Sequence, residues 1–450
     1  MSSSEFGTDG VPLSWYNICA DLGFALPSDL SSSQSTKTAD RLRIPMSLLR
    51  QERSRARWIP IPEDVVDKYR QWRPTPLRRA RALEDALETS CRLYYKYEGG
   101  NVSGSHKLNT AVAQAYFYRR AGRRRLTVGT GAGQWGTAIA AACAMFGLDC
   151  RVFMVRSSYE AKPHRKTMME LFGAEVVPSP SGSTEYGRRS LASGSDTGGS
   201  LGVALAEAVE DGMAPHSAFC AGSGETYALL HQSVIGLETH MQLEELEDRA
   251  DVVVGSLGAG SNLGGIALPF LGSSLRGGPK LRVVSVEPAA CPKLTRGRYA
   301  YDYTDASETS PLQKMYTLGH AFAPPTMHAA GLRYHGTSKL ISALYARNYL
   351  EAVAYPQKAV FESAEIFARA EGIIPAPESA HAIHGARLIA AAADRNGDPR
   401  TIVICLSGHG LLDLGAYDAF HSGEMTDVDV SDEQIESSLA ALPARRFRER

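Results

Sequence analysis

The sequence predicts an α/β protein with two domains, each built on a parallel sheet flanked by helices. Apolar, strand-like stretches alternate with helical stretches between residues 92 and 210, and a second such series begins at 251 and ends at 406. This alternation is typical of parallel sheets that are covered on both faces. The chain has 450 residues, which is more than one hydrophobic core usually organises, so two core-bearing domains are expected.

Periodicity and composition place the individual elements. Apolar and aromatic runs of four to seven residues predict strands, and longer runs with helical spacing predict helices. Glycine-rich turns separate them, and the Ser- and Gly-rich segment 178–200 is expected to be a loop. The expected strands are 92–97, 125–128, 150–155, 175–177, 251–254, 281–286 and 401–406, and the expected helices are 107–120, 135–146, 163–172, 201–210 and 227–246.

Changes in composition suggest four parts of the chain. Residues 1–70 mix Ser, Pro and Arg with short apolar groups, and we expect an arm that packs on the body or on a partner subunit. Residues 71–230 form the expected N-terminal α/β domain, and residues 231–425 the expected C-terminal α/β domain. Residues 426–450 carry acidic clusters before a basic end, which predicts a surface tail.

Composition and charge exclude several function classes. With 48 Lys and Arg against 49 Asp and Glu, the formal net charge is −1, so no global field attracts the protein to nucleic acid or anionic lipid. The seven cysteines are scattered and never closely paired, which predicts reduced thiols and no metal site. We find no targeting or membrane-spanning segment and expect a cytoplasmic protein with a small-molecule substrate.

A glycine-rich segment follows the predicted strand at 251–254 and runs into a helix. It reads Gly255-Ser256-Leu257-Gly258-Ala259-Gly260-Ser261-Asn262. Small residues let backbone N–H groups converge and the helix N-terminus adds a positive dipole, so a phosphate dianion is the natural ligand. A plain tight turn is the alternative, because glycine is also the default turn residue. A dinucleotide site fits less well, because the G-x-G-x-x-G order is not met.

Lys107 stands where a second glycine-rich turn enters a predicted helix, within Ser105-His106-Lys107-Leu108-Asn109. An amine in such a place can be partly desolvated. Burial lowers the pKa of a lysine and supplies the free base that attacks an aldehyde. An isolated lysine in a turn is usually a solvated surface charge, so this interpretation depends on the other motifs.

Two further motifs lie at expected strand ends. The loop Thr130-Gly131-Ala132-Gly133-Gln134 offers backbone donors and two polar side chains, which suit a small anion such as an amino acid carboxylate. Ser407 follows the last apolar strand, at the edge where α/β enzymes gather their ligands, and its hydroxyl could meet a pyridine nitrogen. Glycine and serine also simply terminate strands, so each motif is weak by itself.

Together these motifs resemble the β chain of tryptophan synthase, and specifically its second, stand-alone type. The resemblance covers about residues 94–414, most of the chain. The stretches that carry it are KYEG and SHKLNTAVAQAY (within 96–116), TGAGQWG (130–136), LLHQSVIGLE (229–238), LTRGRYAYD, KMYTLGH and GLRYHG (within 294–336), ESAHAI (378–383) and LSGHG (406–410).

The resemblance implies a fold type II enzyme with pyridoxal 5′-phosphate as its cofactor. Lys107 would be the Schiff-base lysine and the proton shuttle at Cα. His106 and Asn109 would flank the cofactor, with Asn109 near its phenolic oxygen, and Glu378 would line the pocket. The cofactor phosphate would be held in the C-terminal domain by Gly258, Ala259, Gly260, Ser261 and Asn262, where Ala259 replaces a glycine of the family.

The resemblance also assigns the substrate side. Thr130, Gly131, Ala132, Gly133 and Gln134 would bind the substrate carboxylate, within a mobile subdomain of about residues 128–210. Ser407 would be the partner of the pyridine nitrogen. A neutral serine there leaves the ring weakly electron-withdrawing, which favours elimination and addition at Cβ.

The chain departs from this family at one catalytic position. Tryptophan synthase β chains have a glutamate immediately before T-G-A-G-Q, whereas Gly129 precedes Thr130 here. The family implies that this carboxylate assists the leaving hydroxyl and accepts the N–H hydrogen bond of indole. Losing a positioned acid or base costs about 10²-fold to 10⁴-fold in rate. We also expect Gly129 to free the volume of a side chain for a bulkier or differently polar nucleophile.

Glu225 is a second unusual feature, in the loop Gly222-Ser223-Gly224-Glu225, which lies where the family packs against indole. Exposed glutamate is the common state of this residue type, so a solvated turn acid is the simpler expectation. Glu225 is nevertheless the first candidate to replace the acid that is missing at Gly129.

Several functions are compatible with these residues. The first is β-replacement on serine, O-phosphoserine or threonine through an aminoacrylate, which forms a tryptophan-like or other non-proteinogenic amino acid with a nucleophile other than, or besides, indole. The alternatives are a serine or threonine dehydratase, ordinary tryptophan synthase β activity, and a non-catalytic pseudoenzyme. The stand-alone type is associated with O-phosphoserine, whose phosphate leaves without the lost acid. The resemblance further implies a homodimer without an obligatory α subunit.

Overall fold

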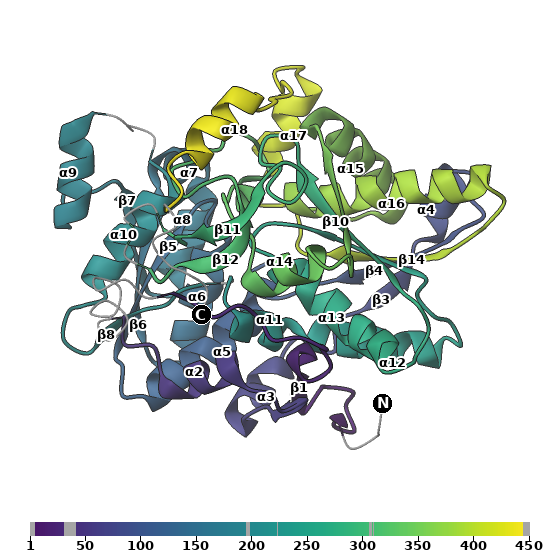
Figure 1. The fold of residues 1–450 in the computed structure, drawn as a ribbon, viewed down its shortest axis with the longest axis horizontal. Coiled ribbons are helices and arrows are strands. Elements are labelled where there is room, and N and C mark those ends of the chain that lie inside the picture. The colour runs from purple at the N-terminus through teal and green to yellow at the C-terminus, as the bar shows by residue number, and fades with distance from the viewer. Residues whose placement is uncertain are drawn as a thin grey trace.

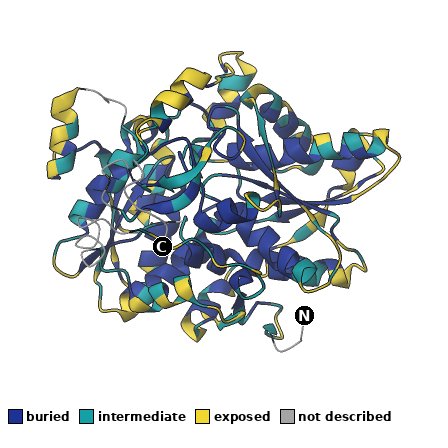
Figure 2. Ribbon diagram, viewed as in Figure 1, coloured by how far each residue is buried: buried dark blue, intermediate teal, exposed yellow. Residues whose placement is uncertain are grey.

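Two parallel sheets organise the chain, as the computed structural model shows (Figure 1). The structure describes residues 5–30, 42–194, 199–222, 224–305, 308 and 310–443. Helices flank both sheets, and the buried residues gather between the layers (Figure 2). The α/β fold class predicted from the sequence is confirmed.

The smaller sheet has four parallel strands in the order β7-β6-β5-β8. Its strands are apolar runs that lie between helices, as expected for a parallel sheet buried on both faces. The strands are β5 (Arg125–Thr130), β6 (Asp149–Val155), β7 (Ala174–Ser179) and β8 (Ser217–Phe219), and the helices are α6 (Gln134–Phe146), α7 (Arg156–Ala161), α8 (Pro163–Leu171), α9 (Glu185–Ser193) and α10 (Leu201–Asp211).

The larger sheet has six strands in the order β13-β10-β9-β14-β4-β3, and only its edge strand β3 is antiparallel. The strands are β3 (Leu77–Arg79), β4 (Arg92–Tyr97), β9 (Val252–Ser256), β10 (Arg282–Pro288), β13 (Glu351–Tyr355) and β14 (Thr401–Leu406). Strands β4, β9 and β14 are neighbours in this sheet, so the loops that follow them leave at the same edge.

The remaining elements surround these sheets. A small antiparallel ribbon, β11 with β12, precedes α14. The bounds are α4 (Arg81–Ala86), α5 (Lys107–Arg120), α11 (Thr226–Gln232), α12 (Val234–Glu245), α13 (Ser261–Leu275), β11 (Arg298–Asp302), β12 (Gln313–Thr317), η3 (Ala330–Leu332), α14 (Lys339–Tyr345), α15 (Gln357–Glu371), α16 (Pro377–Arg395), α17 (Leu414–His421) and α18 (Asp432–Leu439).

The N-terminal arm packs on the body. Its elements are β1 (Ser14–Tyr16), η2 (Ile18–Ala20), α2 (Met46–Arg53), β2 (Trp58–Pro60) and α3 (Glu63–Tyr69). Trp15, Leu48 and Tyr69 are fully buried in the largest hydrophobic cluster. The expectation that residues 1–70 form a packing arm is therefore confirmed for the described part of the arm.

Three expectations from the sequence need correction. The segment 178–200 is not all loop, because it contains the largely exposed helix α9 (Figure 2). The helix expected at 227–246 is two helices that meet at Ser233. The tail is not a surface appendage, because Ile435 and Leu439 of α18 are buried in a cluster with Leu332.

The domain boundary expected at 230 does not coincide with the division between the sheets. Strands β3 and β4 precede this boundary, yet they pair in the larger sheet with β14, far along the chain. The smaller sheet is thus an excursion between β4 and β9. All seven cysteines are buried free thiols. No described helix is both long and apolar enough to cross a bilayer.

Candidate active site

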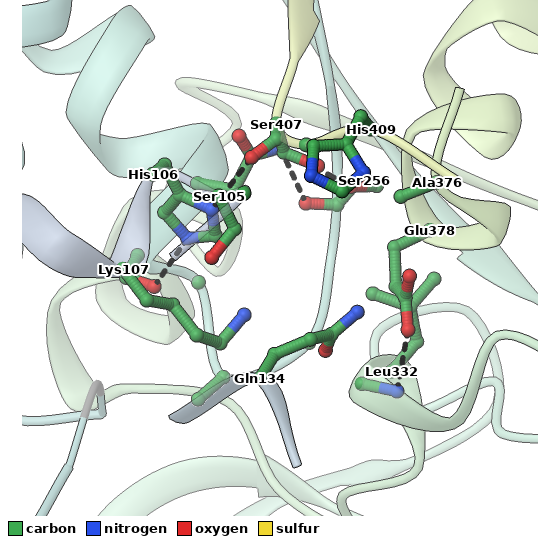
Figure 3. Close-up of a pocket in the computed structure, with 18 of the residues that line it drawn as sticks. Ser105, His106, Lys107, Gln134, Ser256, Leu332, Ala376, Glu378, Ser407 and His409 are labelled. Carbon is green, nitrogen blue, oxygen red and sulfur yellow. Dashed lines mark hydrogen bonds between the residues drawn. The ribbon is translucent and has the colours of Figure 1, made fainter. Parts of the chain in front are cut away.

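A pocket lies where the loops after β4, β9 and β14 meet at the edge of the larger sheet. The N-termini of α5, α6, α13 and α16 contribute to its wall (Figure 3). Its lining consists of Gly104, Ser105, His106, Lys107, Gln134, Arg165, Ser256, Gly258, Ala259, Gly260, Ser261, Asn262, Gly331, Leu332, Ala376, Glu378, Ser407, Gly408 and His409.

Lys107 is the first residue of α5, and its amine points into the middle of the pocket (Figure 3). Burial lowers the pKa of this amine to about 8, with a further lowering by Arg165, while the Glu378 carboxylate opposes the change. Part of the population is therefore a neutral amine near neutral pH, which is the form that attacks a carbonyl carbon.

The predicted phosphate loop, Gly258 to Asn262, leads into α13, whose first N–H groups have no acceptor within the helix. Gly260 has a φ of +115°, which favours glycine, and a Cβ at Gly258 would stand 2.8 Å from the carbonyl oxygen of Gly331. His106 Nε2 lies 3.2 Å from Ser261 Oγ. Burial, assisted by Lys107, lowers the pKa of His106 to about 3, so the ring is neutral.

Ser407 lies at the end of β14 and brings neutral hydroxyls to the pocket. Its Oγ lies 2.7 Å from Ser379 Oγ, and the backbone nitrogen of Gly408 donates a hydrogen bond of 3.1 Å to Ser379 Oγ. The Ser407 carbonyl accepts from the backbone nitrogen of His106 at 2.9 Å. This contact joins the loop before α5 to the end of β14 and fixes Lys107 and Ser407 on the same pocket.

Glu378 faces the pocket from the first turn of α16 (Figure 3). Its Oε1 accepts a hydrogen bond of 2.8 Å from the backbone nitrogen of Gly331. Its Oε2 and the hydroxyl of Ser105 are buried, and neither has a hydrogen-bond partner among the residues the structure describes. Buried polar atoms are rarely left unpaired, so these two fit a polar ligand between them.

Asn109 does not line this pocket, contrary to the expectation that it lies near the cofactor's oxygen. It stands two residues after Lys107 on α5 and therefore faces another way. Its amide donates to Glu98 and to Gln232 at 3.0 Å each, and its Oδ1 accepts from Arg73 at 2.8 Å. Asn109 belongs to a buried polar network below the site.

That network explains two motifs of the sequence, KYEG and the glutamate that ends LLHQSVIGLE. Arg73 pairs with Glu98 and Glu238, and Lys96 pairs with Glu238 at 2.8 Å. All four side chains are fully buried. Burial alone would raise the pKa of Glu98, but the charges of Arg73 and Lys96 outweigh it and hold the pKa at about 2.

The predicted carboxylate loop is only partly in the pocket. Gln134 lines it and points toward its centre (Figure 3), whereas Thr130, Gly131, Ala132 and Gly133 are outside its lining. The hydroxyl of Thr130 accepts a hydrogen bond of 3.3 Å from the backbone nitrogen of Gly136. The assignment of this loop to a substrate carboxylate stays a prediction.

Gly129 is buried, lies outside the pocket lining, and leaves no open volume. A Cβ at this position would stand 2.7 Å from the backbone nitrogen of Leu205 and 2.8 Å from the carbonyl group of Ala204. These backbone atoms belong to α10, so the expected space for a bulkier nucleophile is filled by this helix.

Arg165 is the lining residue that sequence reasoning missed most clearly. It stands on α8, is almost fully buried, and pairs with Asp413 at 2.7 Å. Lys162 binds the other oxygen of Asp413 at 2.5 Å. Two cations thus share one carboxylate at the pocket wall. Nothing in the local sequence of α8 distinguishes Arg165 from a surface residue.

Comparison with known proteins identifies the family. A family profile described as "Pyridoxal-phosphate dependent enzyme" matches residues 69–408. The chain belongs to this family. Within it, the chain is of the tryptophan synthase β chain 2 type, because curated relatives of that name match at about half of all positions.

Two relatives show the extent of the match. "Tryptophan synthase beta chain 2" of Methanosarcina acetivorans is 50% identical over 423 residues, which are 92% of this chain and 95% of the relative. The protein of the same name from Thermotoga maritima is 51% identical over 412 residues, covering 90% of this chain and 97% of the relative. The resemblance drawn from the motifs is thereby confirmed.

Solved structures support the fold at lower identity. A fungal L-serine ammonia-lyase from Rhizomucor miehei matches with a TM-score of 0.58 at 15% identity, covering 78% of this chain and 98% of that one. A bacterial threonine deaminase matches with a TM-score of 0.54 at 22% identity and the same coverage. At these identities the likeness shows the pyridoxal-phosphate fold alone.

The pocket fits the cofactor of this family. The protein uses pyridoxal phosphate, and the buried amine of Lys107, the helix start at Ser261 and the hydroxyl of Ser407 suit its aldehyde, phosphate and ring nitrogen. When bound, the cofactor supplies an electron sink for carbanion chemistry at the amino acid. The protein's own groups hold it and move the proton at Cα.

Proposed function

We propose that this pyridoxal-phosphate enzyme catalyses β-replacement on an amino acid whose leaving group is already activated, with O-phosphoserine preferred over serine and threonine. The product would be a tryptophan-like or other non-proteinogenic amino acid, formed with a nucleophile other than, or besides, indole. Lys107 would hold the cofactor and carry the proton at Cα. Gln134 and the loop before it would bind the donor's carboxylate.

One observation carries this choice of donor. At the pocket wall, Arg165 and Lys162 share the single carboxylate of Asp413, which leaves one positive charge in excess. Charge-assisted hydrogen bonds from Arg suit a phosphate dianion. A serine hydroxyl would instead need a proton to leave, and the position where the family carries its acid is Gly129.

The donor experiment compares serine, threonine and O-phosphoserine with the purified holoenzyme, each with and without indole. We expect phosphate release from O-phosphoserine to exceed turnover of serine. Arg165→Met should raise the KM for O-phosphoserine by about 10-fold or more and change the KM for serine little. Lys166→Met is the matched control, because Lys166 is the next residue of α8 and pairs with Glu170 instead.

The same experiment separates the alternatives. Release of pyruvate or 2-oxobutyrate at full rate without a nucleophile would make the protein a dehydratase. Equal use of serine and indole by the wild type would make it an ordinary tryptophan synthase β chain and contradict the proposal. We further propose that the enzyme acts in the cytoplasm as a homodimer without an α subunit, as the stand-alone type of its relatives suggests.

A further inference from the structure

The loop after β8 borders the active site without lining it. β8 pairs in parallel with β5, with Thr127 opposite Phe219, so the loops that follow these two strands leave at the same edge of the sheet. A Cβ at Gly224 would stand 3.6 Å from the Cβ of Ala259 in the phosphate loop, and one at Gly222 would stand 3.5 Å from Trp135 Nε1. This loop therefore forms the next layer of the wall beyond Ala259.

Three unpaired polar groups gather around this loop. Trp135 Nε1, the hydroxyl of Thr226 and the hydroxyl of Tyr227 are buried and find no hydrogen-bond partner within the described part of the chain. The side chains are 7%, 5% and 1% exposed, respectively. Folded proteins leave few buried polar groups unpaired, so their concentration at one loop points to a polar ligand there.

Glu225 lies in the middle of these groups, at the residue before α11. It is not the solvated turn acid that its residue type suggested. Its Oε2 accepts a hydrogen bond of 3.3 Å from Gln313 Nε2. Burial, and after it the charges of Glu52 and Asp29, raise the pKa of Glu225 to about 7, although Lys339 opposes this.

The charged groups around Glu225 come from separate elements. Glu52 is on α2, Asp29 is in the arm before α2, and Lys339 is on α14. Lys339 Nζ lies 2.9 Å from Glu52 and 3.1 Å from Asp29. Tyr334, two residues after the pocket residue Leu332, also senses Glu225, because burial and then the Glu225 charge raise its pKa.

We propose that Glu225 and Trp135 form the recognition site for the nucleophile, which selects an aromatic compound that donates an N–H or O–H to the Glu225 carboxylate and accepts from Trp135 Nε1. The inference rests on the proposed β-replacement function. The rings of Trp135 and Tyr227 favour an aromatic occupant. Glu225 takes no part in the bond that forms at the donor's β-carbon. It determines specificity by orienting the nucleophile.

This assignment accounts for the departure at Gly129. The backbone of α10 fills the space that a side chain at Gly129 would need, so an acceptor for the nucleophile cannot stand on β5. Glu225 supplies a carboxylate from the neighbouring strand instead. The carboxylate is then farther along the edge of the sheet, which suits a nucleophile with its donor group away from the reacting atom.

The first test is Glu225→Gln in the holoenzyme, with O-phosphoserine as donor. We expect the KM for indole, an aromatic N–H donor, to rise by about 10-fold, because a charge-assisted hydrogen bond becomes a neutral one. The KM for 2-mercaptoethanol, an aliphatic thiol, should stay unchanged. Glu245→Gln, an exposed position on α12, is the matched control and should resemble the wild type with both nucleophiles.

Phosphate release without any nucleophile separates this inference from the proposed function. If the wild type releases no phosphate from O-phosphoserine, the proposed function fails. If it does, and Glu225→Gln leaves the KM for indole unchanged or raises the KM for indole and for the thiol equally, the recognition site is wrong.

The second test uses pH. Protonation removes the acceptor, so the wild-type KM for indole should rise as the pH falls below about 7. In Glu225→Gln this dependence should vanish. Glu52→Gln removes a repelling charge and lowers the pKa of Glu225, so the rise in KM should move to lower pH. A structural role for Glu225 would give no such shift, and an unmoved pH profile in Glu52→Gln would overturn the inference.

Discussion

The backbone nitrogen of Leu205 lies 2.7 Å from the point where a Cβ atom would stand at Gly129. The carbonyl carbon and oxygen of Ala204 lie at 2.8 Å from the same point. These are backbone atoms of α10, which cannot swing aside as the end of a long side chain can. Gly129 is therefore the place where β5 and α10 are in direct contact.

Gly129→Ala should destabilise the protein by about 1–3 kcal/mol, because overpacking a filled site moves backbone or forces strained rotamers. The measurement is thermal or urea unfolding of the holoenzyme. Gly131→Ala, two residues along, is the control, because its new methyl group would lie 3.9 Å from the nearest atom, the carbonyl oxygen of Ala330. Equal stability of Gly129→Ala and the wild type would mean that α10 yields and that Gly129→Glu could be accommodated after all.

The neutral amine of Lys107 governs capture of the cofactor. Since its pKa is about 8, capture by the apoprotein should slow about 10-fold for each pH unit below 8 and level off above it. Stopped-flow absorbance with added pyridoxal phosphate measures this rate. Lys107→Ala should give no covalent capture and lower turnover by at least about 10²-fold.

Glu378→Gln sharpens this test, because the Glu378 carboxylate raises the pKa of Lys107. Its removal should lower that pKa and move the capture profile to lower pH. An unchanged profile would mean that another group controls the reaction.

The sequence predicted the local elements of this protein well. The bounds expected for β4, α5 and β14 are those observed, because each is a continuous apolar or helical run that ends at glycine or serine. Sheet membership was not predictable in the same way. β4 pairs with β14, about 300 residues later, and that pairing depends on the burial of both strands in one layer, which no local pattern encodes.

The site divides along the same line. Lys107, Ser407 and the phosphate loop lie in short motifs whose chemistry is local, and all of them line the pocket. The direction of Asn109 was wrong because it depends on the charges of Arg73 and Glu98, which approach from distant segments. The raised pKa of Glu225 likewise depends on Glu52, which the arm brings near.

The buried charges of Arg73 and Glu98 should be important for stability. Glu98→Gln should cost about 3–5 kcal/mol, because it leaves a cation buried with one partner fewer. The wild-type contribution is fully present above the ordinary pKa of 4.5 and is lost as the pH falls toward about 2. Urea unfolding at pH 7, with Glu245→Gln as an exposed control, measures the difference. A loss under about 1 kcal/mol would show that the network relaxes.

The C-terminal helix should control the pocket through Leu332. Leu332 lines the pocket, and it shares a buried cluster with Ile435 and Leu439 of α18. Ile435→Ala removes a buried side chain that is 3% exposed, which typically costs about 2–5 kcal/mol, and it lets Leu332 shift away from the cofactor's side of the pocket. We therefore expect lower thermal stability and a higher Kd for pyridoxal phosphate, measured by titration of the apoprotein. Leu246→Ala, on a side chain that is 54% exposed, should change neither. If Ile435→Ala lowers stability but leaves the Kd unchanged, α18 supports the fold without shaping the site, and the segment before Leu332 alone must hold it in place.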